Sequence, residues 1–387
     1  MRILAIWPAP PLWHRDLALN VLFLRRMGHD AMLVADERFR PTQSDNRPVE
    51  FVNWNELSTD SWWRSHTFDA VILGLFGATK YSAVRAAALR NCKRVIERLD
   101  TDGVIAPMIS RGAYFDAYWT HYADRGTMVQ RAFAPAIAAV RTIVLSAMPS
   151  LLFRKLAAQL AAVPAVTTPL PLSAKRVQSF IRAYADVARE ISFAPFAIDT
   201  SVFRFDPQVP KKNIVMTIGR WNSRQKDVGL TLNALNTFLT KHSDWNAVII
   251  GPGLPPKRLD KGCSSRVTLA AELPPAEIAS IMQEAKIYFL ASRQEGASLS
   301  CSEALVMGCS IVGPANVACV AFNASANSGT VATRRAVASL TTALDREAIL
   351  WRTGERDPEQ IAQHWLQLHD GTIATQRYVS LFNGMQT

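Results

Sequence analysis

Residues 292–313 read S-R-Q-E-G-A-S-L-S-C-S-E-A-L-V-M-G-C-S-I-V-G, and this stretch decides the fold. The apolar run Ala285–Leu290 before it is typical of a buried parallel strand. Ser302–Met307 predicts a short helix, which the following glycine ends. Glu295 and Glu303 therefore flank a strand-to-helix turn at the carboxyl edge of a parallel sheet, where open α/β sheets bind ligands.

The chemistry of this turn suits a phosphorylated sugar ligand. Peptide N–H groups that open a helix can hold an anion. A carboxylate beside them can accept hydrogen bonds from hydroxyl groups, such as those of a ribose or a sugar. The simpler interpretation of Glu303 is that it complements the helix dipole.

A second motif follows the apolar strand predicted at Asn213–Ile218. Gly219 and Arg220 end that strand, and Lys226 comes six residues after Arg220. Glycine permits close backbone approach, and cations just after a sheet strand can contact phosphate. The simpler interpretation is a set of solvated loop charges, and Arg224 is an additional candidate for phosphate contact.

Together these motifs resemble the E-x7-E and G-R…K elements of the retaining GT-B glycosyltransferases of family 4, also called group 1. Three further segments match in family order: the interdomain segment Ser192–Phe203, the strand-plus-glycine turn Val248–Gly253, and residues Leu273–Ala285, which lead into the E-x7-E strand. The resemblance covers the chain from about residue 190 to 313.

The resemblance implies a role for each matched residue. It implies that the donor diphosphate is bound by Gly219, Arg220, Lys226 and the backbone of Leu299 and Ser300. Glu303 would bind the donor ribose, and Glu295 would contact donor-sugar hydroxyls and stabilise transition-state charge. Arg220, Lys226 and Glu295 are the catalytic candidates. GT-B enzymes generally bind no catalytic metal, so no metal or cofactor is expected besides the nucleotide-diphosphate sugar substrate.

The chain departs from the family pattern at several positions. Pro8–Pro11 stands where the family usually has a Gly-Gly turn after the first strand. The acceptor-loop histidine of many members has no counterpart after the strand predicted at Arg94–Leu99. Within E-x7-E, Ser298 replaces the family's glycine, and Ala297 replaces the aromatic residue that often precedes it.

Four residues are candidates for the acceptor side. Asp100 and Asp102 end a predicted strand, although Asp102 and its following glycine could form only a turn. Their D-x-D spacing is interpreted as an accidental match to a metal motif. His14 follows the proline-rich first loop, and His121 lies among aromatic residues, where packing is the commoner role.

The alternation of strands and helices predicts an α/β protein with two Rossmann-like parallel-sheet domains facing a cleft. We expect an acceptor-binding domain at 1–194, a linker at 195–212, and a nucleotide-sugar-binding domain at 213–357. By resemblance, a C-terminal helix within 358–387 packs back on the first domain. Thr142–Leu145 is predicted as a strand, and Ser173–Glu190 as a helix that Ser173 caps.

Charge is distributed unevenly along a chain whose net charge is +11. Between Gly126 and Ala185 lie seven cations and no acid: Arg131, Arg141, Arg154, Lys155, Lys175, Arg176 and Arg182. Because this stretch is also apolar, it predicts contact with anionic lipid. The alternative is a buried helix pair with solvated cations. Nucleic acid is not expected, since no recognition motif accompanies the charge.

The remaining features predict a cytoplasmic protein, peripheral on the inner face of the membrane. The five cysteines show no metal spacing and fit a reduced compartment. A signal peptide and a membrane span are not expected, because Met1 and Arg2 lead into a strand and no apolar run reaches 18 residues.

The most direct interpretation is a retaining glycosyltransferase of glycan biosynthesis. It would move a sugar from a nucleotide-diphosphate sugar to an acceptor, which could be a lipid-linked or membrane-associated glycan. Two alternatives remain open: a GT-B-fold sugar-nucleotide 2-epimerase, or a non-catalytic sugar-nucleotide-binding partner of polysaccharide assembly. A Rossmann dehydrogenase is not favoured, because no G-x-G-x-x-G follows the first strand.

Overall fold

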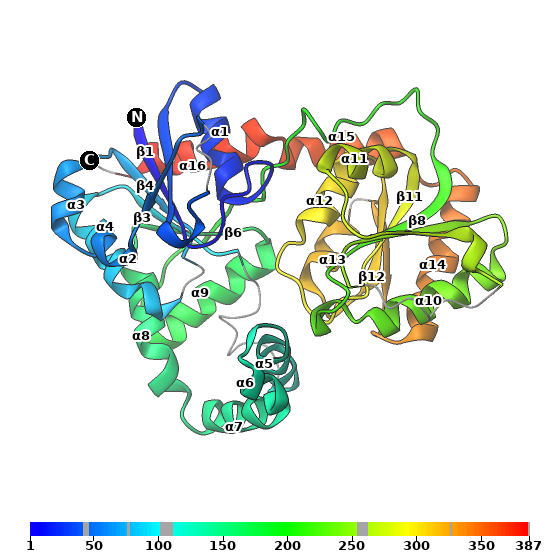
Figure 1. Ribbon diagram of the computed structural model, residues 1–387, viewed down its shortest axis with the longest axis horizontal. Helices are drawn as coiled ribbons and strands as arrows, with labels where there is room; N and C mark the ends of the chain where they lie inside the picture. Colours follow the sequence, from blue (N-terminus) through cyan, green and yellow to red (C-terminus); the bar gives the residue numbers. More distant parts are fainter. Residues whose placement is uncertain (42–45, 76–77, 101–110, 254–261, 326, 386–387) are drawn as a thin grey trace. The chain divides into compact units, whose positions relative to one another are not determined.

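The computed structural model describes residues 1–41, 46–75, 78–100, 111–253, 262–325 and 327–385. The chain divides into two compact units. Unit 1 consists of Met1–Met108, Val144–Asp199 and His369–Thr387, and unit 2 of Ile109–Ile143 and Thr200–Leu368. Each unit contains one parallel sheet with helices between its strands (Figure 1). The predicted α/β class with two parallel-sheet domains is confirmed.

The described sheet of unit 1 has the strand order β3-β2-β1-β4-β5-β6-β7, with all neighbours parallel. Its strands are β1 (Arg2–Trp7), β2 (Asp30–Asp36), β3 (Val49–Val52), β4 (Ala70–Leu73), β5 (Val95–Arg98), β6 (Ala165–Thr168) and β7 (Ser192–Phe193). The helices of this unit are α1 (Asp16–Arg26), η1 (Glu37–Phe39), α2 (Trp54–Leu57), α3 (Asp60–Ser65), η2 (Thr79–Tyr81), α4 (Ser82–Asn91), α8 (Pro149–Ala162), α9 (Pro171–Ala185) and α16 (Gly371–Gly384).

The core of unit 1 includes the contact between its first and last helices. Side chains of β1 and β4 are buried together with the inner faces of α1 and α16. Within this core the Asn20 amide donates to the Thr375 hydroxyl over 2.9 Å, and both side chains are buried. The chain thus returns at α16 to complete the unit that it began at β1.

The described sheet of unit 2 has the order β10-β9-β8-β11-β12-β13, again parallel throughout. Its strands are β8 (Lys212–Ile218), β9 (Asn246–Ile250), β10 (Val267–Ala270), β11 (Ala285–Phe289), β12 (Ser310–Pro314) and β13 (Gly329–Ala332). Its helices are α5 (Arg111–Arg125), α6 (Met128–Ala132), η3 (Arg224–Lys226), α10 (Val228–Lys241), η4 (Ser264–Arg266), α11 (Pro275–Glu284), α12 (Leu299–Val306), α13 (Ala318–Asn323) and α14 (Val337–Arg352). Two helices run from unit 2 into unit 1: α7 (Ala134–Ala147) and α15 (Pro358–His369).

Two sequence-based expectations about secondary structure are wrong. Thr142–Leu145 is not a strand, because these residues lie within α7. A short β-branched run fits either a strand or a packed helix, and here the helix forms. Ser173 does not cap α9, which begins earlier at Pro171, a residue whose fixed φ suits the first helical position. Helix α9 also ends at Ala185, before the expected Glu190.

Within the described residues, no helix combines the length and the apolar character needed to cross a bilayer.

The helix predicted after β11 is confirmed as α12, which begins at Leu299 and ends at Val306. Gly308 follows with φ +74°, and a Cβ there would lie 2.6 Å from the Pro358 carbonyl oxygen. Glycine is therefore needed where the chain turns from α12 toward β12.

Candidate active site

The ends of β8 and β9 form the base of the candidate site. The Gly219 N–H donates to the Ile250 carbonyl over 3.0 Å, and the Trp221 indole N–H donates to the same carbonyl over 2.9 Å. Gly251 has φ +124°, and a Cβ there would lie 1.8 Å from the Gly219 carbonyl oxygen. Only glycine fits at 251, so the turn after β8 is held directly against the end of β9.

Lys226 and Glu295 meet at this edge of the sheet. Lys226 ends η3, and Glu295 follows β11. The Lys226 Nζ lies 2.6 Å from Glu295 Oε1, and the two side chains are 15% and 9% exposed. The structure therefore brings together one residue from each of the two predicted motifs. A half-buried cation and a buried carboxylate at a strand edge can each exchange their partner for a polar ligand.

Helix α12 begins beside this pair with a strained residue. Ser298 is the N-cap and has φ +50° and ψ 85°, a left-handed conformation that favours glycine. The first hydrogen bond inside the helix is donated by the Cys301 N–H to the Ser298 carbonyl, over 2.9 Å. The N–H groups of Leu299 and Ser300 precede it, as is usual for donors in the first turn of a helix.

Side chains beneath the helix start fix its position. The buried Tyr288 hydroxyl donates to Ser300 Oγ over 2.7 Å. Burial raises the pKa of Tyr288 well above its ordinary value, so the ring stays a neutral donor. Glu303 lies within α12 and is partly buried.

Arg220 lies on the exposed side of the turn after β8. Its carbonyl oxygen accepts from the Ser223 N–H over 3.0 Å, which closes the turn. Its guanidinium forms no ion pair with the described carboxylates. An exposed arginine on a tight turn is free to bind a ligand phosphate.

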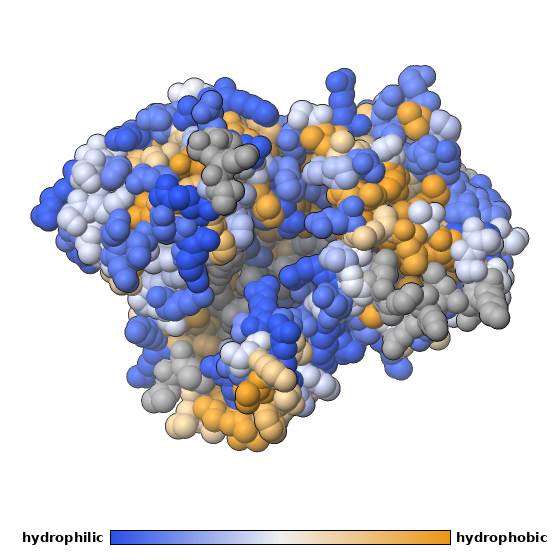
Figure 2. Space-filling model, in the orientation of Figure 1, coloured by the Kyte–Doolittle hydropathy of each residue, from blue (hydrophilic) through white to orange (hydrophobic). Residues whose placement is uncertain are grey.

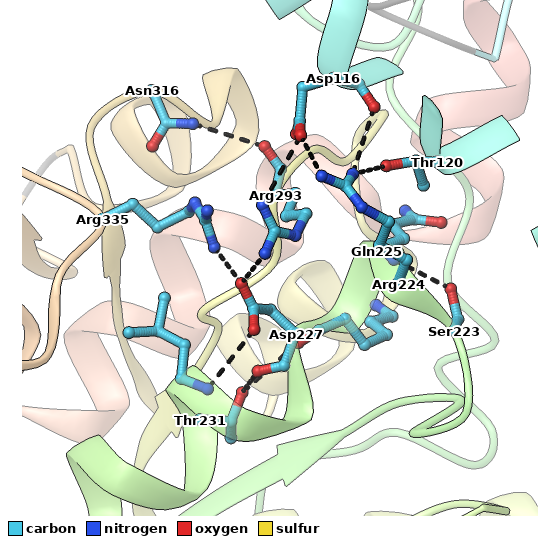
Figure 3. Close-up of polar contacts among 12 residues, drawn as sticks. Asp116, Thr120, Ser223, Arg224, Gln225, Asp227, Thr231, Arg293, Asn316 and Arg335 are labelled. Atoms are coloured by element: carbon cyan, nitrogen blue, oxygen red, sulfur yellow. Dashed lines mark hydrogen bonds and ion pairs between the residues drawn. The ribbon is translucent and has the colours of Figure 1, made fainter. Parts of the chain in front are cut away.

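Arg224, the additional phosphate candidate, is engaged by α5. Its guanidinium donates to Asp116 Oδ1 and to Thr120 Oγ1, each over 2.6 Å (Figure 3). It also lies 3.9 Å from the centre of the Trp119 ring. A third hydrogen bond runs to the Asp116 carbonyl over 3.4 Å, and together these contacts give Arg224 a structural role in unit 2.

Asp124, one turn after Thr120 on α5, accepts hydrogen bonds from the turn that leads to Lys226. Its donors are the Ser223 hydroxyl, the Arg224 N–H over 2.8 Å, and the Gln225 N–H over 3.4 Å. One carboxylate thus satisfies backbone and side-chain donors at the start of η3. Helix α5 therefore holds the candidate phosphate turn in place.

The turn is also bonded to the loop that carries Glu295. The Arg293 N–H donates to the Gln225 carbonyl over 2.8 Å, and the Gln225 amide donates to the Gln294 carbonyl over 2.9 Å. These two bonds place Lys226 within reach of Glu295.

Asp227 forms the centre of a second charge cluster (Figure 3). Its Oδ2 pairs with Arg293 over 2.8 Å and with Arg335, which follows β13. Its Oδ1 accepts from the Leu230 N–H over 3.4 Å and caps α10. Arg293 also lies 3.6 Å from Asp116. The cluster ties the loops after β8, β11 and β13 into one rigid edge.

The described acceptor-side candidates fall in both units of the structure. Asp100 pairs with Arg98 over 2.6 Å in unit 1, and burial raises the Asp100 pKa although Arg98 opposes this. His14 is exposed on the loop before α1 in unit 1. His121 is exposed on α5 in unit 2, edge-on to the Tyr122 ring at 5.2 Å. Asp102 lies outside the described residues. An acceptor role for these four residues stays a prediction.

Sequence reasoning missed the residues that support the site. Asp116 and Asp124 lie about a hundred residues before the turn they hold, and nothing in their spacing indicates the contact. Asp227 carried a readable signal, because an Asp directly before an apolar helical pattern is a common N-cap. Arg293 lies inside the decisive stretch, but its partners Asp227 and Arg335 could not be read from it.

Residues 212–370 match the family model described as "Glycosyl transferases group 1". No curated protein matches the sequence.

Solved structures match over nearly the whole chain. Sucrose-phosphate synthase from Thermosynechococcus elongatus is 12% identical, with a TM-score of 0.64 and coverage of 98% of each chain. Anabaena Alr3699/HepE in complex with UDP and glucose is 13% identical, with a TM-score of 0.64 and coverage of 99% of this chain and 100% of that one. A glycosyltransferase from Rickettsia africae ESF-5 is 11% identical, with a TM-score of 0.64 and coverage of 99% and 98%. At these identities the likeness shows a shared fold.

Proposed function

We propose that this chain, whose fold is shared with solved glycosyltransferases and whose residues 212–370 match the group 1 family model, transfers a sugar from a nucleotide-diphosphate sugar to an acceptor with retention. The observation that carries the proposal is the Lys226–Glu295 pair of 2.6 Å beside the start of α12. It provides a cation, a carboxylate and helix N–H groups at one sheet edge.

The donor diphosphate would occupy this edge. Lys226 and the exposed Arg220 supply positive charge, and the N–H groups of Leu299 and Ser300 supply donors at a helix N-terminus. Gly219 lets the phosphate approach the backbone. Charge on a leaving diphosphate grows in the transition state, so these groups bind the transition state more strongly than the ground state.

Glu295 and Glu303 would bind the two sugars of the donor, the transferred sugar and the ribose. Glu303 would accept hydrogen bonds from the ribose hydroxyls, and Glu295 from the hydroxyls of the transferred sugar. When the donor binds, Lys226 would replace part of its contact with Glu295 by a contact with phosphate, and Glu295 would contact the sugar.

Retention follows if the acceptor attacks the face from which the diphosphate leaves. The acceptor oxygen forms a bond to the anomeric carbon, the bond from that carbon to the phosphate oxygen breaks, and the acceptor proton passes to the leaving diphosphate. This scheme needs no separate protein base. Arg220 and Lys226 can supply the charge that a metal supplies elsewhere, so we propose a metal-independent reaction.

We propose a lipid-linked or membrane-associated glycan as the acceptor, and a cytoplasmic protein that binds the membrane peripherally. The support is the acid-free stretch 126–185, in which Arg154 and Lys155 are exposed on α8. HepE, with a similar fold, is described in complex with UDP and glucose, which makes UDP-glucose the first donor to test.

The test is a thermal-shift screen against UDP, GDP, ADP and their sugars, since a ligand that binds the folded state raises its melting temperature. We expect one nucleotide series to stabilise the protein, and Arg220→Ala to reduce that shift. Arg346→Ala, which changes an exposed arginine on α14, is the matched control. The proposal fails if no nucleotide or nucleotide sugar shifts the wild type.

Product analysis separates the alternatives. An isomerised sugar nucleotide formed without acceptor would identify an epimerase. Donor binding without turnover on any acceptor would identify a non-catalytic partner. Transfer with retained anomeric configuration is the outcome that we expect.

A further inference from the structure

Large apolar side chains are exposed together on α6, on α7 and at the residue that joins them. In unit 2 they are Met128 (88% exposed), Val129 (68%), Phe133 (61%), Val140 (60%) and Ile143 (67%), and we call them the α6–α7 apolar face. In Figure 2 apolar residues gather over these helices at the bottom of the view. Isolated exposed apolar residues are ordinary, but a group of this size within 16 residues marks a contact surface.

The face is a regular stripe on α7. Ala136, Val140 and Ile143 are exposed at positions i, i+4 and i+7, which lie on one side of a helix. Ala134 and Ala138 are buried on another side. A helix on an ordinary protein surface turns its larger apolar residues inward, whereas α7 turns Val140 and Ile143 outward.

The segment that carries this face, residues 126–185, has charges of one sign only. No Asp or Glu occurs between residues 126 and 185. Arg131 and Arg141 are exposed on α6 and α7, within two residues of apolar residues of the face. Arg131 Nε donates to the Gly126 carbonyl over 2.9 Å, and the Arg141 guanidinium lies 4.8 Å from the centre of the Tyr118 ring. These contacts with uncharged groups orient both cations without neutralising them.

We propose that the α6–α7 apolar face inserts into the surface of an anionic lipid bilayer, with Arg131 and Arg141 binding lipid phosphates. The inference deepens the proposed function, on which it rests for the membrane-bound acceptor, and it places the contact on named side chains. Apolar residues on an interfacial helix enter the boundary between headgroups and acyl chains, while flanking cations are attracted to anionic headgroups.

Charge argues against a second copy of this chain as the occupant. A two-fold contact through the same face would bring Arg131 and Arg141 of both copies together, with no carboxylate from residues 126–185 to pair them. An anionic bilayer satisfies the apolar side chains and the guanidinium groups together.

The experiment is vesicle co-sedimentation with phosphatidylcholine alone and with phosphatidylcholine containing phosphatidylglycerol. We expect the wild type to bind the anionic vesicles at low salt, and binding to weaken as salt increases. Val140→Asp combined with Ile143→Asp should weaken binding about tenfold or more, because it places charge on the inserting stripe. Ile349→Asp, at an exposed residue on α14, is the matched control and should bind like the wild type.

A second variant tests the cations, and sedimentation velocity without vesicles tests self-association. Arg131→Glu with Arg141→Glu should weaken binding to anionic vesicles and leave the nucleotide thermal shift unchanged. The inference is overturned if the wild type ignores anionic vesicles at low salt, or if the Val140/Ile143 variant binds them like the wild type. A concentration-dependent dimer that only this variant abolishes would also overturn it, in favour of a second copy.

The two proposals can fail separately. Loss of vesicle binding with an intact nucleotide shift removes the membrane surface alone. A wild type that binds vesicles but no nucleotide removes the glycosyltransferase proposal alone.

Discussion

Lys226 and Glu295, which lie 69 residues apart in the sequence, form an ion pair of 2.6 Å between Nζ and Oε1. Among the described residues, each is the ion-pair partner of the other. A nucleotide-diphosphate sugar carries a phosphate that a lysine can bind and hydroxyl groups that a carboxylate can bind. Binding would therefore replace one protein contact by two ligand contacts, and either residue alone would be left with an unpaired charge.

Lys226→Ala should lower kcat/KM for the true donor by about 10²–10³, because it removes a charge-assisted contact that strengthens in the transition state. Lys212→Ala is the control, since it breaks an exposed ion pair of 2.6 Å with Glu284 in the same unit. Steady-state kinetics on both variants decides the matter. Equal losses in the two variants would show that the effect is general and that Lys226 has no special role.

Glu303→Gln should raise the donor Kd more than it lowers the melting temperature. Glutamine keeps the shape of the side chain but replaces a charged acceptor, which we propose faces the ribose hydroxyls, by a weaker one. A loss of about tenfold in affinity corresponds to roughly 1.4 kcal/mol, the range of one hydrogen bond to a charged group. Calorimetry with the matching nucleoside diphosphate measures it. Unchanged affinity in a folded variant would leave Glu303 with only its place in the helix dipole.

Asp124→Asn should raise the donor KM without preventing folding. Asparagine keeps one acceptor oxygen, but the charge that binds the Ser223 hydroxyl and the Arg224 N–H is lost. Hydrogen bonds to a charged group contribute about 1.5–3 kcal/mol, so the turn before Lys226 should loosen. Asp124 would then be a positioning residue that acts through Lys226.

The control for Asp124 is Asp357→Asn, which changes an exposed carboxylate that accepts from the Glu359 and Gln360 N–H groups. It should lower stability slightly and leave the donor KM unchanged. If Asp124→Asn changes melting temperature alone, α5 supports the fold of unit 2 and does not position the donor.

His369 should make unit 1 sensitive to acid. Burial lowers the pKa of His369 to about 4 from an ordinary value of 6.5, and its Nδ1 lies 2.9 Å from the Phe196 carbonyl oxygen. The folded state favours the neutral ring, so below pH 6.5 the unfolded chain binds more protons. Stability is complete above pH 6.5 and falls as the pH approaches 4, by at most about 3 kcal/mol.

Thermal unfolding between pH 7 and pH 4 measures this effect. His369→Gln keeps a donor for the Phe196 carbonyl and does not titrate, so its stability should vary less over that interval. His364→Gln, at an exposed histidine on the same helix, should keep the wild-type dependence. A wild-type curve that is parallel to the His369→Gln curve would contradict the assignment.

The sheet of unit 2 could be predicted from sequence because buried parallel strands are rich in apolar residues, and β8 and β11 are mostly apolar. The position of Lys226 and Glu295 at one edge followed from that topology. Thr142–Leu145 could not be assigned, since a short β-branched run carries no periodicity that separates strand from helix.

The residues that support the site, such as Asp124, could not be predicted from sequence for a different reason. The hydrogen bonds of Asp124 to the turn at Ser223–Gln225 span about a hundred residues, and charged side chains on a helix usually face solvent. Ser298 shows the opposite case. Its departure from the family's glycine was visible in the sequence, and the structure shows a serine with φ +50° at that place.

The discontinuity of unit 1 has a consequence for synthesis on the ribosome. Helix α1 is translated early, but α16, which packs on it through Asn20 and Thr375 and seats Gly371 against the Phe23 ring, comes from the stretch His369–Thr387. Unit 2 is translated in between. The nascent chain therefore holds an uncovered apolar face on α1 until unit 2 has emerged, and such a face is a binding site for chaperones. Domains usually fold in the order of translation, whereas here unit 1, which is translated before unit 2, can complete its folding only after unit 2 has been translated.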